Sequence, residues 1–169
     1  FSGAESLLTF LTFETLGYSP RDNGLMFVYV GFIIAMVQGG YVRRKANEVG
    51  EAKMARNGLL MLIPSLVLLS VAGHIESNWV LYIALFLMAV GSAMAIPCMT
   101  SLVSLYTPAS DQGRVLGVFR SLGALARTVG PLVGGILYWK IGFHGPYYAG
   151  ALCMIIPILI MLKLPSLKK

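Results

Sequence analysis

Long apolar segments alternate with short polar stretches along the whole chain. Residues 1–17 fit the outer part of one apolar segment. Five more segments reach or approach the roughly 20 residues that cross the hydrocarbon core of a bilayer: 24–42, 57–73, 79–106, 115–139 and 146–164. The pattern predicts an all-α membrane protein with six transmembrane helices. Because the first apolar segment is already under way at Phe1, we also expect further chain to precede it.

The composition supports this class of protein and argues against others. Hydrophobic residues make up 57% of the 169 positions and charged residues 12%, whereas a soluble domain has about 25% charged residues. There is no H-E-x-x-H, G-x-S-x-G or P-loop motif, so we expect no enzyme activity, metal or cofactor. The net charge of +6 is better explained by basic cytoplasmic loops than by nucleic-acid binding. The expected surroundings are therefore a lipid bilayer.

The cations are distributed unequally between the two sides of the predicted membrane. One side has Arg21 and Lys140. The other has nine cations: Arg43, Arg44, Lys45, Lys53, Arg56, Arg114, Lys163, Lys168 and Lys169. Because Lys and Arg gather on cytoplasmic loops, we expect the 43–56 loop and the C-terminus in the cytoplasm. The membrane would be the plasma membrane or an internal membrane.

Similar motifs recur in the two halves of the chain. Residues 19–24 read SPRDNG and residues 107–113 read TPASDQG, in the loops after the first and fourth apolar segments. Residues 61–69 (MLIPSLVLL) and 154–162 (MIIPILIML) match in the third and sixth segments. The order of these matches predicts a 3+3 repeat, and because three is odd, the two copies are inverted in the membrane. Inverted repeats are typical of secondary transporters with a site near the midplane.

Residues 120–135, RSLGALARTVGPLVGG, separate two kinds of side chain around a helix. At about 100° per residue, the small residues, the polar residues and both arginines share one face. The bulky aliphatic residues share the other face. Since small residues let helix backbones approach closely in a membrane, we expect the small face to pack against protein and the bulky face to contact lipid.

The two arginines of this helix are candidates for substrate binding or gating. Arg120 lies near the cytoplasmic end, where it could instead anchor the chain to lipid phosphates. Arg127 lies about three turns deeper than Arg114, and a charge at the centre of a spanning helix costs about 2.5–3.5 kcal/mol. We expect Arg127 either to join a structural network inside the bundle or to act in gating or in attracting a substrate anion.

Gly130, Pro131, Gly134 and Gly135 form a candidate kink and packing motif. Proline removes one helical hydrogen bond and tends to kink the helix, while the glycines allow close packing around the bend. The bend would either serve packing alone or open during a transport cycle.

Glu5 and Gln38 are the other polar candidates inside apolar segments. Glu5 lies about 18 Å inside the outer boundary at 1.5 Å per residue, near the midplane, where a carboxyl group can carry a proton. It is a proton-coupling residue, the structural partner of an arginine, or a residue nearer the cytoplasmic side. Gln38 either hydrogen-bonds a neighbouring helix or contacts substrate. Glu14, near the outer end, is expected to be solvated.

The segment 120–135 resembles a helix of the major facilitator superfamily, in its drug:proton antiporter branch. FSGAE at 1–5, QGGYVRR at 38–44 and IPCMTSLVS at 96–104 resemble the same branch, so the similarity covers essentially the whole chain. The resemblance implies that the chain is the C-terminal half of a twelve-helix fold. The N-terminal half is missing from this sequence and would be the partner of this half.

The resemblance also implies positions and roles for several helices. The helices that hold Glu5 and Ser92 would line the central cavity, and those that hold Gln38 and Arg127 would pack against the missing half. It implies alternating-access transport of small organic solutes, of the drug or organic anion type, by proton-coupled antiport. A uniporter of the same fold and a transport-inactive membrane scaffold or receptor remain alternatives.

Gly39, Arg43 and Arg44 resemble the second copy of the family's cytoplasmic loop signature. That signature usually has an acidic residue before the basic pair and a glycine after it. Val42 and Lys45 stand at those two positions, so the signature is incomplete as a charge-relay gate.

Overall fold

The computed structural model describes residues 2–163, except the side chain of Asn47, and this range is helical apart from short connections. Phe1, Lys168 and Lys169, on which sequence predictions rest, lie outside the described residues. The helices are α1 (Ser2–Leu16), α2 (Pro20–Met36), the π-helix η1 (Val37–Val42), α3 (Arg43–Val49), α4 (Glu51–Ile75), α5 (Asn78–Leu105), α6 (Gln112–Ile141), α7 (His144–Cys153) and α8 (Ile155–Leu162).

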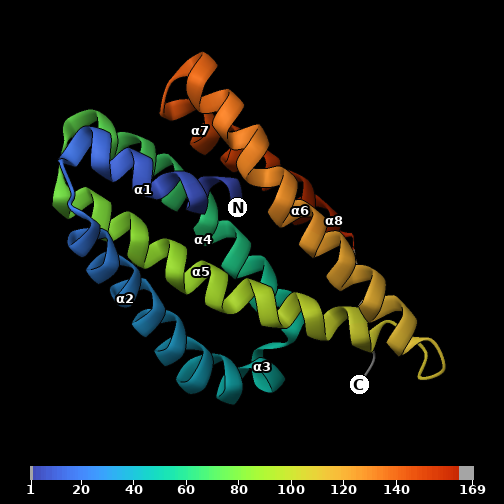
Figure 1. Ribbon diagram of the computed structural model, residues 1–169. Helices are drawn as coiled ribbons and strands as arrows, with labels where there is room; N and C mark the ends of the chain where they lie inside the picture. The colour runs from blue at the N-terminus through green and yellow to red at the C-terminus, as the bar shows by residue number, and fades with distance from the viewer. Residues whose placement is uncertain (1, 164–169) are drawn as a thin grey trace.

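Within the described residues the helices make six passes between the two ends of the molecule (Figure 1). One pass consists of α2, η1 and α3, and another of α7 and α8. Four passes contain segments long and apolar enough to cross a membrane: Pro20–Ala46, Glu51–Ile75, Asn78–Leu105 and His144–Leu162. Of the others, α1 has 15 described residues, and α6 is long enough but less apolar.

The described cations lie unequally at the two ends. The α1–α2, α4–α5 and α6–α7 connections share one end, and the α3–α4 and α5–α6 connections share the other (Figure 1). The second end, called the basic end below, holds Arg43, Arg44, Lys45, Lys53, Arg56, Arg114 and Lys163. The first, called the opposite end, holds Arg21 and Lys140.

The second pass begins earlier than its predicted start at residue 24, because a capping box starts α2 at Pro20. The backbone N–H of Asp22 donates to the Ser19 hydroxyl at 3.3 Å, and the Ser19 N–H donates to the Asp22 carboxylate at 3.0 Å. These bonds satisfy backbone groups that a helix start leaves unpaired. Proline at the first helical position has no N–H to satisfy.

The prediction of a loop at 43–56 is wrong, because nearly all of this segment is helical. The second pass continues through α3 to Val49, and α4 begins at Glu51, well before the predicted start near Asn57. Only Gly50 interrupts the two helices, with a φ of 88°, a backbone conformation that glycine adopts readily. The charged residues of this segment suggested a loop, yet Lys45 and Glu48 form an ion pair along α3 at 2.5 Å, a spacing that supports a helix.

Some prolines lie inside continuous helices, whereas another coincides with a helix break. Pro64 and Pro131 lie within continuous α4 and α6. Pro157, in contrast, accompanies a break at Met154 that divides the last pass into α7 and α8. Because proline has no N–H, it cannot pair with the carbonyl oxygen of Cys153 four residues earlier.

The centre of the fold is the contact between α4 and α5, where two glycines bring the backbones together. A Cβ added to Gly58 would lie 2.6 Å from the carbonyl oxygen of Gly91, and one added to Gly91 would lie 2.8 Å from the carbonyl oxygen of Gly58. Around this contact the core includes the fully buried side chains of Leu66, Leu69, Leu81 and Leu85.

The packing of the passes is reciprocal between the two predicted repeats. The first helix of the first repeat, α1, packs on α6, and the first helix of the second repeat, α5, packs on α2. An inverted two-fold axis maps each repeat onto the other, so the first helix of each repeat must pack on the second helix of the other repeat. The loops differ in detail, since Ser19 caps α2 with its side chain whereas Asp111 does not cap α6.

Replacing Gly58 by Ala should destabilise the protein, because the new methyl group would lie 2.7 Å from the backbone nitrogen of Ala95 as well as against Gly91. Overpacking of this kind costs about 1–3 kcal/mol. Gly31→Ala on α2 is the control, since its Cβ would meet no atom within 4 Å and alanine favours a helix over glycine by about 1 kcal/mol. Thermal unfolding in detergent should show a lower midpoint for Gly58→Ala only. Equal midpoints would contradict the packing argument.

Candidate functional site

Helices α1 and α6 touch through backbone atoms of the predicted packing motif. A Cβ added to Gly3 would lie 2.5 Å from the carbonyl oxygen of Gly130, and one added to Gly134 would lie 2.9 Å from a leucine side chain of α1. Pro131 lies between these two contacts. Gly135 has open space around it, with no atom within 4 Å of an added Cβ. The α1–α6 contact therefore uses two of the three glycines of the motif.

A side-chain hydrogen bond joins the same two helices closer to the opposite end. The hydroxyl of Tyr138 on α6 donates to the carboxylate of Glu14 on α1. Glu14 is exposed, as expected for a solvated residue, but it is also this acceptor. The sequence places Tyr138 on the small face of its helix, yet no periodicity in either helix pairs it with Glu14. The pair depends on how the helices cross.

Glu5 lies on the open side of α1. The exposed residues on this side include Ser6, Thr9, Phe10 and Phe13, while Leu8 and Leu11 on the other side are fully buried. Among residues 2–163 the one ion pair joins Lys45 and Glu48, so a pair between Glu5 and an arginine is not present there. The open side of α1 therefore combines a carboxyl group, two hydroxyl groups and two aromatic rings.

Arg120 and Arg127 lie exposed on α6. Neither forms an ion pair within the described residues, so a structural network around Arg127 is absent from this part of the chain. Both guanidinium groups are therefore accessible to a solute or to further protein.

The contact side of α6 is narrower than its predicted small face. Gly130, Gly134 and Tyr138 contact α1, but Gly113 and Gly117 have no atom within 4 Å of an added Cβ. On the bulky face the exposed side chains include Leu122, Leu125 and Leu132. Within the described residues, most of the small face thus remains uncovered.

Gln38 lies in η1 with an exposed side chain. The predicted hydrogen bond to a neighbouring helix is absent from residues 2–163. Gly39, next to it, has no atom within 4 Å of an added Cβ. Arg43 and Arg44 follow on α3 and are both exposed. The residues that resemble a loop signature therefore lie on a continuous helical surface.

Sequence reasoning missed Glu51, which links α4 to α5 near the basic end. The Ser101 hydroxyl donates to one carboxylate oxygen of Glu51 at 2.7 Å, and the other oxygen is buried with no hydrogen-bond partner among the described residues. A buried carboxylate oxygen without a partner is costly. The available sequence signal was an acidic residue, Glu51, within the basic segment 43–56, which the charge pattern predicts to be a loop.

At the opposite end, polar contacts join the connections to the helices. Tyr18, between α1 and α2, donates its hydroxyl to the Asn78 side chain at 3.0 Å. Burial raises the pKa of Tyr18 to about 12, with Tyr82 beside it adding to the shift. Nδ1 of His144 lies 2.9 Å from the Ser70 hydroxyl. The first contact joins the α1–α2 connection to the start of α5, and the second joins the start of α7 to α4.

The candidate site is made of a few exposed charged side chains beside a close helix contact. Within the described residues, no group of three or more His, Cys, Asp or Glu side chains could hold a metal ion. The site instead offers an exposed carboxyl group on α1 and two exposed guanidinium groups on α6, beside a helix contact made by glycines.

Comparison with known proteins identifies relatives of almost the whole chain. The sequence profile of the Major Facilitator Superfamily matches residues 1–169. The chain is 36% identical over 164 residues to major facilitator superfamily domain-containing protein 10 of Homo sapiens, covering 97% of this chain and 35% of that protein. It is 31% identical over 115 residues to the class E tetracycline resistance protein of Escherichia coli, covering 68% of this chain and 27% of that protein.

The fold is similar to a solved structure. It matches the crystal structure of the human organic anion transporter MFSD10 (TETRAN) with a TM-score of 0.88 and 34% sequence identity. The match covers 95% of this chain and 37% of that one. The chain thus spans about a third of the length of these relatives.

Removing the Tyr138 hydroxyl should loosen the α1–α6 junction. Tyr138→Phe deletes the bond to Glu14 and keeps the ring, so we expect about 1 kcal/mol of lost stability and a lower midpoint of thermal unfolding. Tyr148→Phe on α7 is the control, because Tyr148 is also partly exposed and its hydroxyl forms no such interhelical bond among the described residues. A midpoint unchanged in both variants would show that the hydrogen bond does not hold the junction.

Proposed function

Because the chain belongs to the Major Facilitator Superfamily, as the resemblance in its sequence indicated, we propose that it forms the C-terminal six-helix half of a transporter for small organic solutes. The solutes would be of the drug or organic anion type. The observation that supports this most strongly is the match of nearly the whole chain to a human organic anion transporter. The N-terminal half of the same protein would complete the transport pathway.

The α1–α6 junction is suited to alternating access. Its glycine contacts bring backbones together at Gly3 and Gly130, with one leucine side chain of α1 seated against Gly134. Few side chains therefore need to repack when the two helices tilt against each other. The bond between Tyr138 and Glu14 closes the junction near the opposite end. We propose that this bond forms in one orientation of the transporter and breaks in the other.

Glu5 is the proposed proton-coupling residue. It lies on the open side of α1, near two hydroxyl-bearing side chains. No described arginine pairs with its carboxyl group, which leaves this side chain accessible from the open side of α1. Antiport results if the solute cannot bind while Glu5 is protonated and Glu5 cannot be protonated while the solute is bound. Binding of one then requires release of the other.

Arg127 is the proposed contact for the anionic group of a solute. Its guanidinium is exposed and unpaired by any described carboxylate, and arginine binds carboxylates through two parallel hydrogen bonds. Arg120 lies two turns closer to the basic end and would attract anions toward the same face. The open small residues beside them would pack against the N-terminal half.

The chain is an integral membrane protein, as its family and four long apolar segments indicate. We propose that the basic end faces the cytoplasm, because short loops rich in Lys and Arg are retained on that side. The region 43–56 and the C-terminus would then be cytoplasmic.

Glu5→Gln should uncouple solute movement from proton movement. In liposomes that contain the full-length protein, we expect solute-driven proton flux to fall about tenfold, equivalent to about 1.4 kcal/mol. Exchange of solute for solute should persist, since it needs no change in protonation. Asp111→Asn, which neutralises an exposed carboxylate in the α5–α6 connection, is the control. Undiminished proton flux in Glu5→Gln would favour a uniporter, and the absence of any flux in the wild type would favour a scaffold or receptor.

Arg127→Ala should weaken transport of anionic solutes selectively. We expect the KM for an organic anion to rise about tenfold, within the range for a lost charged hydrogen bond, with a smaller rise for Arg127→Lys, which keeps the charge but loses the planar fork. Arg21→Ala at the opposite end is the control for charge. Transport rates measured with one anionic and one neutral solute separate the outcomes, because equal losses for both solutes would contradict a role in anion binding.

A further inference from the structure

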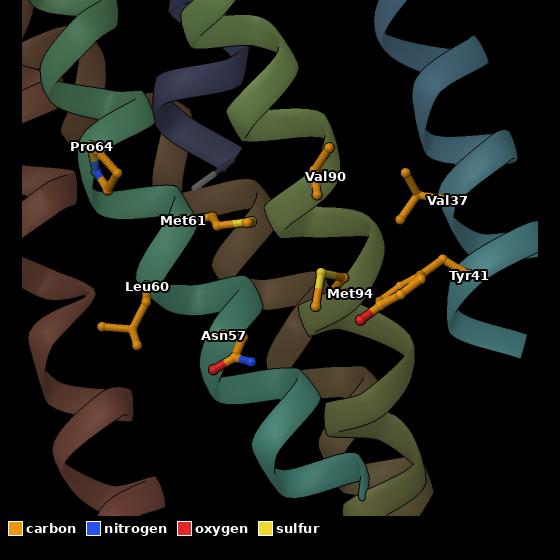
Figure 2. Close-up of a pocket in the computed structure, with 8 residues that line it drawn as sticks. All are labelled: Val37, Tyr41, Asn57, Leu60, Met61, Pro64, Val90 and Met94. Atoms are coloured by element: carbon orange, nitrogen blue, oxygen red, sulfur yellow. The ribbon is translucent and has the colours of Figure 1, made fainter. Parts of the chain in front are cut away.

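An apolar groove of about 580 Å³ lies between η1, α4 and α5. Val90 and Met94 of α5 line it, together with Val37 and Tyr41 of η1 on one side and Leu60 of α4 on the other (Figure 2). The flanking walls belong to segments that are apolar enough to span a membrane. In a bilayer, such segments would place the groove among lipid chains.

The wall made by α4 changes from apolar to charged toward the basic end. Pro64, Met61, Asn57 and Lys53 follow one another at spacings of three or four residues, so they share one side of the helix. Asn57 and Lys53 are exposed. In Figure 2, Pro64 lies at one end of this wall and Asn57 at the other. Lys53 continues the same side by one more turn.

The wall made by the second pass changes in the same order. Val37 is apolar, and Tyr41 is amphipathic and 48% exposed. Arg44, three residues further on α3, is exposed and charged. Figure 2 shows the Tyr41 hydroxyl directed from η1 toward Met94 of α5. A π-turn within a longer helix, such as η1, is frequently found at functional sites.

The basic end of the groove carries excess positive charge. Residues 43–57 contain five cations and two carboxylates, a net charge of +3. One carboxylate, Glu48, pairs with Lys45 at 2.5 Å, and the other, Glu51, accepts the Ser101 hydroxyl on the α5 side. Among the described residues, Arg44 and Lys53 form no ion pair. They are exposed and therefore remain available to an anion at the basic end of the two walls.

We propose that this groove is a binding site for an anionic phospholipid of the leaflet at the basic end. One acyl chain lies along the apolar part, and the phosphate lies between Lys53 and Arg44. Tyr41 and Asn57 sit between the two regions, where a lipid has its ester oxygens, and both can donate hydrogen bonds. The sequence of apolar, amphipathic and charged positions on both walls matches the order of groups along a phospholipid.

The same features argue against other occupants. A small soluble anion would leave the apolar walls unused, and a zwitterionic lipid would leave the net positive charge uncompensated. Basic pockets between membrane helices are suited to anionic headgroups, as are Lys and Arg clusters beside a spanning segment. The site is separate from the α1–α6 junction and does not depend on the proposed transport function.

The test is native mass spectrometry of the full-length protein, titrated with phosphatidylserine or phosphatidylcholine in detergent. Wild-type protein should retain phosphatidylserine in preference to phosphatidylcholine, and added salt should reduce that preference. The double variant Lys53→Glu/Arg44→Glu should retain about tenfold less phosphatidylserine. The matched control is Arg21→Glu/Lys140→Glu, which makes the same charge change at the opposite end and should behave as wild type.

A second pair of variants tests the apolar part. Val37→Trp fills the groove and should reduce retention of phosphatidylserine at least threefold, within the effect of lost apolar burial. Val28→Trp places the same side chain on an exposed position of α2 and should change nothing. Equal retention of the two lipids by the wild type, at low and high salt, would overturn the proposal without any variant. The proposal would also be overturned if neither Lys53→Glu/Arg44→Glu nor Val37→Trp reduced the retention of phosphatidylserine. It would be overturned as well if the control variants reduced retention as much as the groove variants do.

Discussion

The structure depends on backbone contact between helices at glycine. In a bilayer, apolar side chains gain little by leaving lipid for protein, so helices associate where small residues let them approach closely. Gly58 and Gly91 bring α4 and α5 together, and Gly3 and Gly130 do the same for α1 and α6. The first contact lies among the buried leucines that form the core. The second is extended by one side-chain hydrogen bond, between Tyr138 and Glu14. The two contacts combine a close-packed centre with a junction that has few interlocking side chains.

This way of packing explains why polar groups remain on open surfaces. The glycine contacts use only a narrow side of α1 and α6, so Glu5 and Arg127 stay exposed beside them. A charge in a membrane is expensive unless it meets a partner or a watered cavity. Their exposure is therefore consistent with the proposal that this surface faces a transport pathway or a second half of the protein.

A second organising feature is the gradient of polarity along the passes. Most of the described basic residues lie at one end, where α3 and the first turns of α4 extend the spanning helices beyond their apolar parts. Both walls of the groove between η1 and α4 follow this gradient, from Val37 to Arg44 and from Pro64 to Lys53. The placement of cations at a membrane surface thus supports two proposals, the orientation of the protein in the membrane and the lipid-binding site.

The sequence by itself determined the helical class, the six passes and the apolar side of the helix that contains residues 120–135. These properties follow from composition and periodicity, which act locally, whereas the family was indicated by the resemblance of its motifs. Ser19, Pro20 and Asp22 form a capping box that is also recognisable in the sequence. Helix 43–49 was interpreted as a loop because its charges obscured the pattern. Only the tertiary structure decided the pairs Glu14–Tyr138 and Glu51–Ser101, whose members are 124 and 50 residues apart. Periodicity shows which side of a helix meets a neighbour, but the partner of a side chain depends on where the two helices cross.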